Sequence, residues 1–136
     1  MSNTDWSYNG TFYAGPTDIK EQYGFVYKIT NIKTGKSYIG AKFFWKPHYR
    51  MIAKKKKKLM VESDWRTYWS SSELLKSDVK EFGEDSFTRE ILHLVKFKGA
   101  IKYLETKEIM IRECLESDKF YNSFVGCNIH RRCVRF

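Results

Sequence analysis

The feature that most constrains the fold is the stretch of residues 24–42, GFVYKITNIKTGKSYIGAK, in which two short apolar–polar alternations flank a polar turn. Alternation with a period of two is typical of half-buried strands, so this pattern predicts strands over residues 25–30 and 37–41. The polar residues between them, which include Asn31 and Gly35, are of the kinds that favour turns. A two-stranded antiparallel unit is therefore the expected centre of the fold.

Each predicted strand carries one tyrosine, Tyr27 or Tyr38. If Thr30 pairs with Gly35, the two tyrosines lie directly opposite each other and point to one face. Tyrosines in a hairpin are more often packing residues than chemical ones. A phenol, with a pKa near ~10, is a poor base unless a cation or a metal-bound water assists it.

The rest of the chain predicts further strands and helices on each side of this unit. Pro47 is placed to open a helix within residues 43–65. Residues 70–83, with a serine N-cap and a terminal glycine, are predicted to form a helix. Residues 86–97 alternate and are predicted to form a third strand. Residues 98–117 have the spacing of a second helix, with Ile111 and Leu115 on its apolar face. The order predicts a small α/β (α+β) layer structure.

Length and composition indicate one domain that meets a polyanion. We expect the 136 residues to form one unit, with an irregular arm over 1–22, a core over 24–124 and a basic tail over 125–136. The formal charge of +9 makes nucleic acid the first candidate partner. The odd number of cysteines, three, and the absence of a signal-like start or an apolar run of about 20 residues favour a cytoplasmic protein without a membrane span.

Positive charge concentrates between residues 42 and 66. Tryptophans and tyrosines interleave with the cations there and offer stacking surfaces, a combination that favours nucleic-acid binding over a merely solvated face. Binding of that kind should weaken steeply with salt. The candidate nucleic-acid-binding residues are Lys46, Lys54, Lys55, Lys56, Lys57, Lys58 and Arg66, and the five consecutive lysines are expected on a solvated loop or arm.

Two groups of residues are candidates for holding a metal. Glu105 and Glu108 lie at one margin of the apolar face of the last predicted helix, where a carboxylate can hold a hard divalent ion. Cys127, His130 and Cys133, with Cys114, resemble part of a zinc site. The arginines between them oppose a cation, so zinc is disfavoured.

The motifs together resemble the GIY-YIG nucleases. Residues 25–27, Phe-Val-Tyr, match the first triplet loosely, and residues 38–40, Tyr-Ile-Gly, match the second letter for letter. Residues 70–92 resemble the central helix, glycine turn and third strand of the family, and YLETKEI with FYN resembles its last helix and the segment after it. The resemblance covers about residues 24–124.

This resemblance implies a fold, an activity and roles. The implied fold is a three-stranded antiparallel sheet flanked by helices. The implied activity is hydrolysis of DNA, most simply double-stranded, with Mg²⁺ or Mn²⁺. Enzymes of this type are carried by bacteriophages and mobile elements. Tyr27 would act as general base or orient the attacking water, with Tyr38 in support. Glu105, preferred over Glu108, would hold the metal. Lys42 would lie near the attacked phosphate, and Asn122 would fix the geometry of the site.

The chain also departs from the family pattern. The glycine of the first triplet is displaced to Gly24, and Ser70 stands where some members have a histidine. The arginine that stabilises the phosphate has no clear equivalent: Arg50 is nearest, and Lys46 or Arg66 are alternatives. A catalytically degenerate nucleic-acid-binding protein on the same fold is therefore the rival hypothesis, and a basic protein that inhibits another protein is a weaker one. The oligomeric state is left open, with a dimer on DNA as one arrangement.

Overall fold

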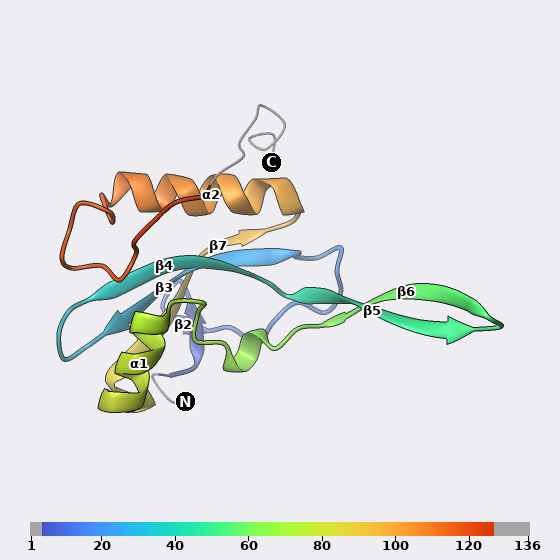
Figure 1. Ribbon diagram of the computed structural model, residues 1–136, viewed down its shortest axis with the longest axis horizontal. Helices are drawn as coiled ribbons and strands as arrows, with labels where there is room; N and C mark the ends of the chain where they lie inside the picture. Colours follow the sequence, from blue (N-terminus) through green and yellow to red (C-terminus); the bar gives the residue numbers. More distant parts are fainter. Residues whose placement is uncertain (1–3, 127–136) are drawn as a thin grey trace.

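The computed structural model of the protein describes residues 4–126. Along the chain it contains β1 (Trp6–Tyr8), β2 (Thr11–Phe12), β3 (Gly24–Asn31), β4 (Ser37–Phe43), β5 (Trp45–Ile52), β6 (Lys55–Glu62), a short 3-10 helix η1 (Trp65–Thr67), α1 (Glu73–Phe82), a second 3-10 turn η2 (Glu84–Ser86), β7 (Phe87–Val95) and α2 (Lys98–Ile111) (Figure 1). Neither α1 nor α2 combines the length and apolar character that crossing a membrane requires.

A five-stranded mixed sheet in the order β2-β1-β7-β3-β4 forms the body of the domain. Its antiparallel centre, β7-β3-β4, consists of the three strands predicted from the sequence, which confirms the mixed α/β class. The prediction of an irregular arm over residues 1–22 is wrong in part. β1 pairs in parallel with the free edge of β7 because Trp6, 3% exposed, packs into the core and donates a 2.8 Å hydrogen bond to the Trp65 carbonyl.

The register of β3 and β4 differs from the prediction by two residues. Thr30 pairs with Ser37, so Tyr27 lies opposite Gly40 and Tyr38 lies opposite Ile29. The loop is longer than expected because the Asn31 side chain accepts hydrogen bonds from the backbone N–H groups of the two residues in the turn, Lys33 and Thr34. The two tyrosines nevertheless share a face, as predicted, with ring centroids 6.2 Å apart.

Residues 43–65 form a two-stranded ribbon, β5–β6, and the prediction of a helix opening at Pro47 is wrong. The strands pair from Trp45 with Glu62 to Ile52 with Lys55. Ala53 and Lys54 close the ribbon with φ of 49° and 63°, the left-handed pair that a tight two-residue hairpin turn requires. The ribbon projects from the body (Figure 1), and all five lysines of its run are exposed, as predicted.

Helix α1 begins and ends where the sequence predicts. The Ser72 side chain accepts a hydrogen bond from the Leu75 backbone N–H at 3.2 Å, and Gly83, with φ of 86°, ends the helix. Helix α2 ends earlier than predicted, at Ile111. Ile111, the last residue of the helix, and Leu115, beyond its end, are 65% and 44% exposed, so the prediction that both lie on the apolar face is wrong.

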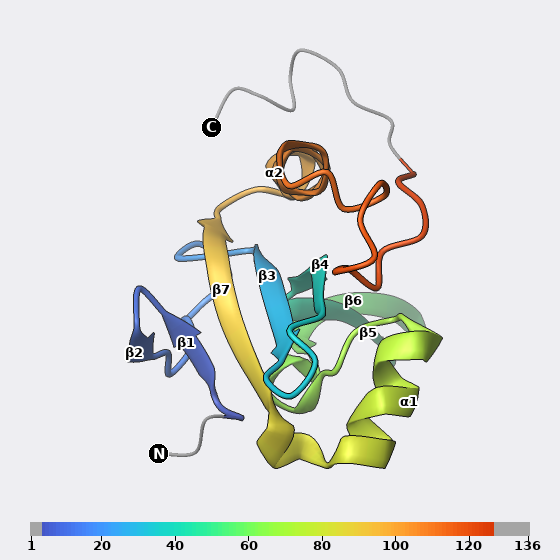
Figure 2. The ribbon, with the colours of Figure 1, turned by 90° about the vertical axis from the view of Figure 1, so that its left-hand side faces the viewer.

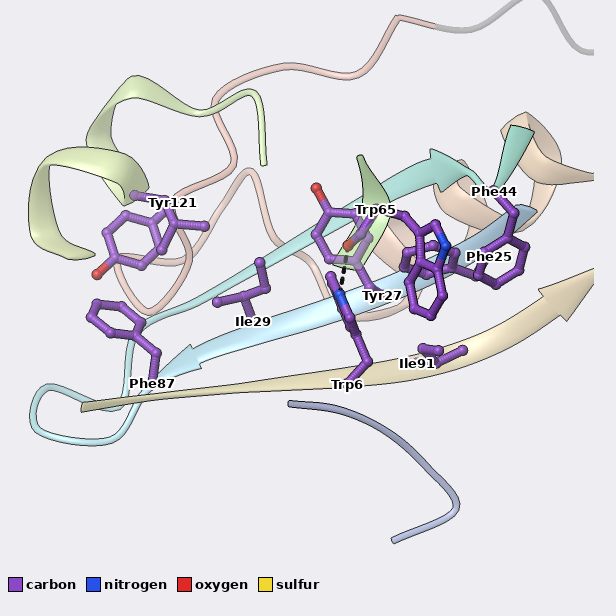
Figure 3. Packing of buried hydrophobic residues seen from close by; sticks show 10 residues of the cluster. Trp6, Phe25, Tyr27, Ile29, Phe44, Trp65, Phe87, Ile91 and Tyr121 are labelled. Atoms are coloured by element: carbon purple, nitrogen blue, oxygen red, sulfur yellow. Dashed lines mark hydrogen bonds between the residues drawn. The ribbon is translucent and has the colours of Figure 1, made fainter. Parts of the chain in front are cut away.

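The core has two parts, one on each face of the sheet. The first is dominated by aromatic side chains, including Phe25, Tyr27 and Trp65, and it extends to Leu75 of α1 (Figure 3). The second packs Val26 and Ile39 of the sheet against α2. Because successive strand residues point to opposite faces, helices α1 and α2 lie on different sides of the sheet (Figure 2). The edge strand β4 runs between them.

Candidate active site

Two adjoining pockets beside strand β4 form a cleft. The first, of about 410 Å³, has α1, Tyr38 and the segment around Asn122 in its walls. The second, of about 440 Å³, lies toward the ribbon and has Lys42, Lys46 and Asp64 in its walls. Lys102 and Glu105 of α2 line both pockets, so the Glu105 carboxylate lies where they meet. We refer to the two pockets together as the cleft.

Tyr38 lines this cleft, and the rings of Tyr27 and Tyr68 pack behind it. Tyr27 is 1% exposed, and its hydroxyl and that of Tyr68 are hydrogen-bonded to each other, while Ser71 hydrogen bonds both Tyr38 and Tyr68. Burial raises the pKa of Tyr27 well above its ordinary value, and the neighbouring tyrosines and Glu105 add to that effect. Burial also raises the pKa of Tyr38. Both phenols are therefore protonated at neutral pH.

Gly40, the last residue of the Tyr-Ile-Gly triplet, makes this arrangement possible. A Cβ atom at this position would lie 2.6 Å from Tyr27 Cζ and 2.8 Å from Tyr38 Cε2, so any side chain would displace the rings. Gly24, the displaced glycine of the first triplet, has a different role. Its Cβ would meet Ile101 Cδ1 at 2.6 Å, which shows that Gly24 permits the close packing of β3 against α2.

The two glutamates of α2 have different surroundings. The Glu108 carboxylate accepts hydrogen bonds from His93 at 3.0 Å and Arg112 at 2.8 Å. These partners outweigh the effect of burial and lower the Glu108 pKa. Glu105 instead pairs with Lys102 at 3.2 Å and borders the cleft. Glu108 thus ties α2 to β7, and Glu105 is the α2 carboxylate available to a ligand.

The donor set around Glu105 fits a hydrated Mg²⁺ or Mn²⁺. Within residues 4–126 no three His, Cys, Asp or Glu side chains cluster as a metal site. Mg²⁺, however, is usually held by one or two carboxylates, several waters and the phosphates of the substrate, and one carboxylate in an open cleft meets that need. Burial raises the pKa of Cys114 to about 11, which disfavours the thiolate that zinc requires. The other proposed zinc ligands, Cys127, His130 and Cys133, lie outside the described residues.

Lys42 connects the tyrosines to the second pocket. Its ammonium group lies 2.7 Å from an Asp64 oxygen and 4.1 Å from the centroid of the Tyr68 ring. The hydrogen bond and charge of Lys42 lower the pKa of Asp64, with a smaller contribution from Lys46. Lys42 and Lys46 are therefore both on the cleft wall, where an anionic substrate can reach them.

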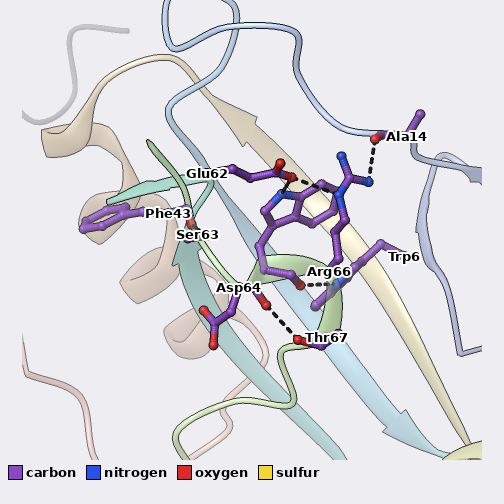
Figure 4. A network of polar contacts seen from close by, with 9 residues as sticks. Trp6, Ala14, Phe43, Glu62, Ser63, Asp64, Arg66 and Thr67 are labelled. Carbon is purple, nitrogen blue, oxygen red and sulfur yellow. Dashed lines mark hydrogen bonds and ion pairs between the residues drawn. The ribbon is translucent and has the colours of Figure 1, made fainter. Parts of the chain in front are cut away.

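The three cations considered for the phosphate-stabilising role are not equivalent. Lys46 lines the cleft, whereas Arg50 lies on the exposed ribbon, paired with Lys57, and borders neither pocket. Arg66 donates to Glu62 and to the Ala14 carbonyl, and its guanidinium stacks over Trp65 at 4.4 Å (Figure 4). Arg66 thus holds the N-terminal segment to the root of the ribbon.

The segment after α2 is fixed to the edge of β4. The Asn122 amide makes two hydrogen bonds to the Ile39 backbone, accepting from its N–H at 3.0 Å and donating to its carbonyl at 2.8 Å. Tyr121 donates a 2.6 Å hydrogen bond to Asp78 of α1. These contacts join β4, α1 and the last segment around the first pocket.

Two residues that line the cleft, Ser71 and Lys102, were not identified from the sequence as site residues, nor was Tyr68, whose ring lies under Lys42. The spacing of Lys102 and Glu105, three residues apart on a helix, was a usable signal, because such residues are neighbours on the helix surface. Tyr68 and Ser71 precede α1 in an irregular segment without a periodic pattern. In this segment Ser70, buried and with a φ of 87°, accepts a hydrogen bond from the Ser72 N–H, and its conformation sets the entry into α1.

Comparison with known proteins gives two matches. A family model described as "Putative endonuclease segE, GIY-YIG domain" matches residues 6–125. The protein named "Putative endonuclease segE" of Enterobacteria phage T4 is 30% identical over 105 residues, which are 76% of this chain and 42% of that protein. The chain thus spans less than half the length of this curated relative. No solved structure matches the chain.

Proposed function

The chain belongs to the SegE-type GIY-YIG family, and from this membership and the geometry of the cleft we propose that it is a metal-dependent endonuclease that hydrolyses phosphodiester bonds of double-stranded DNA. The observation that supports the proposal most is the position of Glu105, a cleft-lining carboxylate beside protonated tyrosines and Lys42. A phosphodiester needs an activated water, a cation at the non-bridging oxygens and a stabilised leaving oxygen. These residue types meet those needs.

Glu105 would hold one Mg²⁺ or Mn²⁺, which supplies positive charge at the phosphate and lowers the pKa of a bound water. The resemblance implied two roles for Tyr27, and its raised pKa favours orientation over base catalysis. We assign to Tyr38, which lines the cleft, the orientation of the attacking water. We assign to Tyr27 the positioning of Tyr68 beneath Lys42.

The remaining residues bind and align the substrate. Lys42 and Lys46 would contact the phosphate backbone, with Lys42 exchanging its Asp64 partner for a phosphate oxygen. The position of Lys46 in the cleft wall favours it over Arg50 and Arg66 as the cation beside the attacked phosphate. Asn122 keeps Ile39 and the first pocket in place, and the exposed Lys54–Lys58 run attracts DNA over a longer range.

A nucleic-acid-binding protein without activity is the second candidate. Two observations favour it: the Glu105 carboxylate is paired with Lys102, and no arginine lines either pocket among the described residues. The match to the phage protein also covers only part of that protein. If the gene is phage-borne, the site of action is the cytoplasm of the host cell.

Cleavage of supercoiled plasmid tests the proposal directly. The assay compares Mg²⁺ with EDTA, and Glu105→Gln with Glu116→Gln, the same change at an exposed position outside both pockets. We expect nicked or linear product that requires the metal, is lost in Glu105→Gln and persists in Glu116→Gln. Intact plasmid under every condition, with salt-sensitive retardation in a gel, would support the binding protein instead.

A further inference from the structure

The β5–β6 ribbon is an exposed structure without a core of its own. It pairs eight residues of each strand, about 24 Å of ribbon, and its outer half carries exposed apolar side chains such as Met51 and Ile52. An isolated two-stranded hairpin is marginally stable in water. A ribbon of this length whose outer half is exposed indicates a binding element.

The register divides the ribbon into two faces of unequal charge. We call one the cleft-side face; it carries Lys46, His48, Arg50, Ile52, Lys55, Lys57, Leu59 and Val61. The opposite, outer face carries Trp45, Pro47, Tyr49, Met51, Lys56, Lys58, Met60 and Glu62. The cleft-side face has four cations and no carboxylate, whereas the outer face has two lysines and one glutamate. Lys56 of the outer face is also engaged, 4.6 Å from the centroid of the Tyr49 ring.

The cleft-side face is continuous with the cleft. Lys46, at the root of this face, lines the second pocket together with Lys42 and Glu105, and Trp45 at the root of the outer face borders the same pocket. From Lys46 the cationic side chains continue outward along the same face to Arg50 and, across the strand pair, to Lys57 and Lys55. The positive charge therefore forms one track that starts beside the proposed scissile phosphate.

We infer that the cleft-side face of the ribbon lies in the major groove of duplex DNA, on one side of the phosphate held in the cleft. The inference takes DNA as the partner and in that respect rests on the proposed function. The major groove, about 12 Å wide, admits a two-stranded β-ribbon. From Lys46 to Ile52 the strand advances about 20 Å, or roughly six base pairs at 3.4 Å each. Arg50, on this face, is the side-chain type that recognises guanine in that groove.

Binding measurements with two matched double variants test which face meets the DNA. Arg50→Ser with Lys57→Ser removes two charges from the cleft-side face, and Lys56→Ser with Lys58→Ser removes two from the outer face. In the Glu105→Gln background, fluorescence anisotropy on a labelled duplex gives affinity without cleavage. We expect the cleft-side pair to lower affinity at least about tenfold and the salt slope by about 2. The outer pair, which contributes only general attraction, should lower affinity about threefold.

An RNA duplex of the same sequence is the second probe. Its major groove is too deep and narrow for the ribbon, so the two double variants should bind RNA equally. Equal losses of DNA affinity in both pairs would overturn the inference, because the ribbon would then act as an unoriented polycation.

Plasmid cleavage by the same variants with Glu105 intact separates this inference from the proposed function. If the parent protein cleaves with metal but the two double variants lose DNA affinity equally, only the inferred orientation of the ribbon is refuted. Face-dependent binding without any cleavage would refute the nuclease alone.

Discussion

Two hairpins follow each other in this chain, and they have the same local geometry in opposite environments. β3–β4 and β5–β6 are both antiparallel pairs closed by short turns with left-handed residues. Six of the eight residues of β3 are buried, whereas seven of the eight residues of β5 are exposed. The first hairpin is held by side chains on both faces of the sheet. The second is held by its own cross-strand pairs and its turn.

This difference matches what each hairpin is proposed to do. Catalytic groups must be held within a fraction of an ångström, and close packing around Tyr27 and Gly40 provides that constraint. A groove-binding ribbon has to fit a polyanion whose shape varies with sequence, and it needs exposed charge more than a fixed position. Hairpin geometry alone therefore says little about function. The environment of each hairpin separates the candidate catalytic element from the candidate binding element.

The largest expected effect is a difference in unfolding free energy between two truncations, one of an aromatic residue in each hairpin. Phe25 is fully buried against Trp6 and Phe44, with centroid distances of 5.0 and 4.7 Å. Phe25→Ala should lower the free energy of unfolding by about 3–5 kcal/mol, because it removes apolar contacts and leaves a cavity. Tyr49 is half-exposed, and Tyr49→Ala should cost less than about 0.5 kcal/mol.

Urea denaturation measures both values, and Phe25→Leu serves if the alanine variant does not fold. A loss at Tyr49 as large as that at Phe25 would mean that the ribbon packs against the body, and the contrast between the two hairpins would be lost.

A smaller effect is expected at alkaline pH from Tyr27. Burial raises its folded pKa, so its stabilising contribution is complete below the unfolded pKa of about 10 and is lost as pH rises toward the folded value. Each such tyrosine lowers the free energy of unfolding by up to about 1.4 kcal/mol per pH unit in that range. Tyr13 and Tyr121, each with a pKa raised to about 12, add to the slope.

Tyr27→Phe should accordingly give a stability curve that falls less steeply above pH 10 than that of the parent protein. Denaturant titrations between pH 9 and about 11.5 measure both slopes. Parallel curves would show that Tyr27 ionises as readily in the folded protein as in the unfolded chain, and the raised pKa that favours orientation over base catalysis would be wrong.

The sequence allowed the central strands, α1 and the shared face of Tyr27 and Tyr38 to be predicted, because alternation and capping are local signals. The register was missed because Asn31 organises the turn with its side chain, a contact that spacing does not reveal. The strand β1 was missed because it depends on the free edge of β7, which lies more than 80 residues away.

The site was predictable to a similar degree. Glu105 and Asn122 were proposed through motif order, and both line the first pocket; their roles stay predictions. Arg50 was a candidate because it is the arginine nearest to the place of the phosphate-stabilising arginine of the family, in a segment expected to be helical; the ribbon carries it outward instead. Tyr68 lies under Lys42 at the end of an irregular segment, whose path depends on tertiary packing and not on local pattern.

The smallest expected effect is at the tip of the ribbon. Ala53 and Lys54 both occupy left-handed conformations, which cost an L-residue about 1–2 kcal/mol each, whereas Asn-Gly is the pair preferred in such turns. Ala53→Asn with Lys54→Gly should therefore stabilise the ribbon by about 1 kcal/mol and slow amide exchange in β5 and β6 about fivefold. Exchange in β3 and β4 should not change, because their packing is independent of the tip.

Lys54→Ser controls for the lost charge in this experiment and should not slow exchange. If the Asn-Gly variant slows exchange in both hairpins alike, the ribbon and the body open together as one cooperative unit. In that case the ribbon would be as much a part of the rigid scaffold as the β3–β4 hairpin, and adaptability to DNA could not explain its exposure.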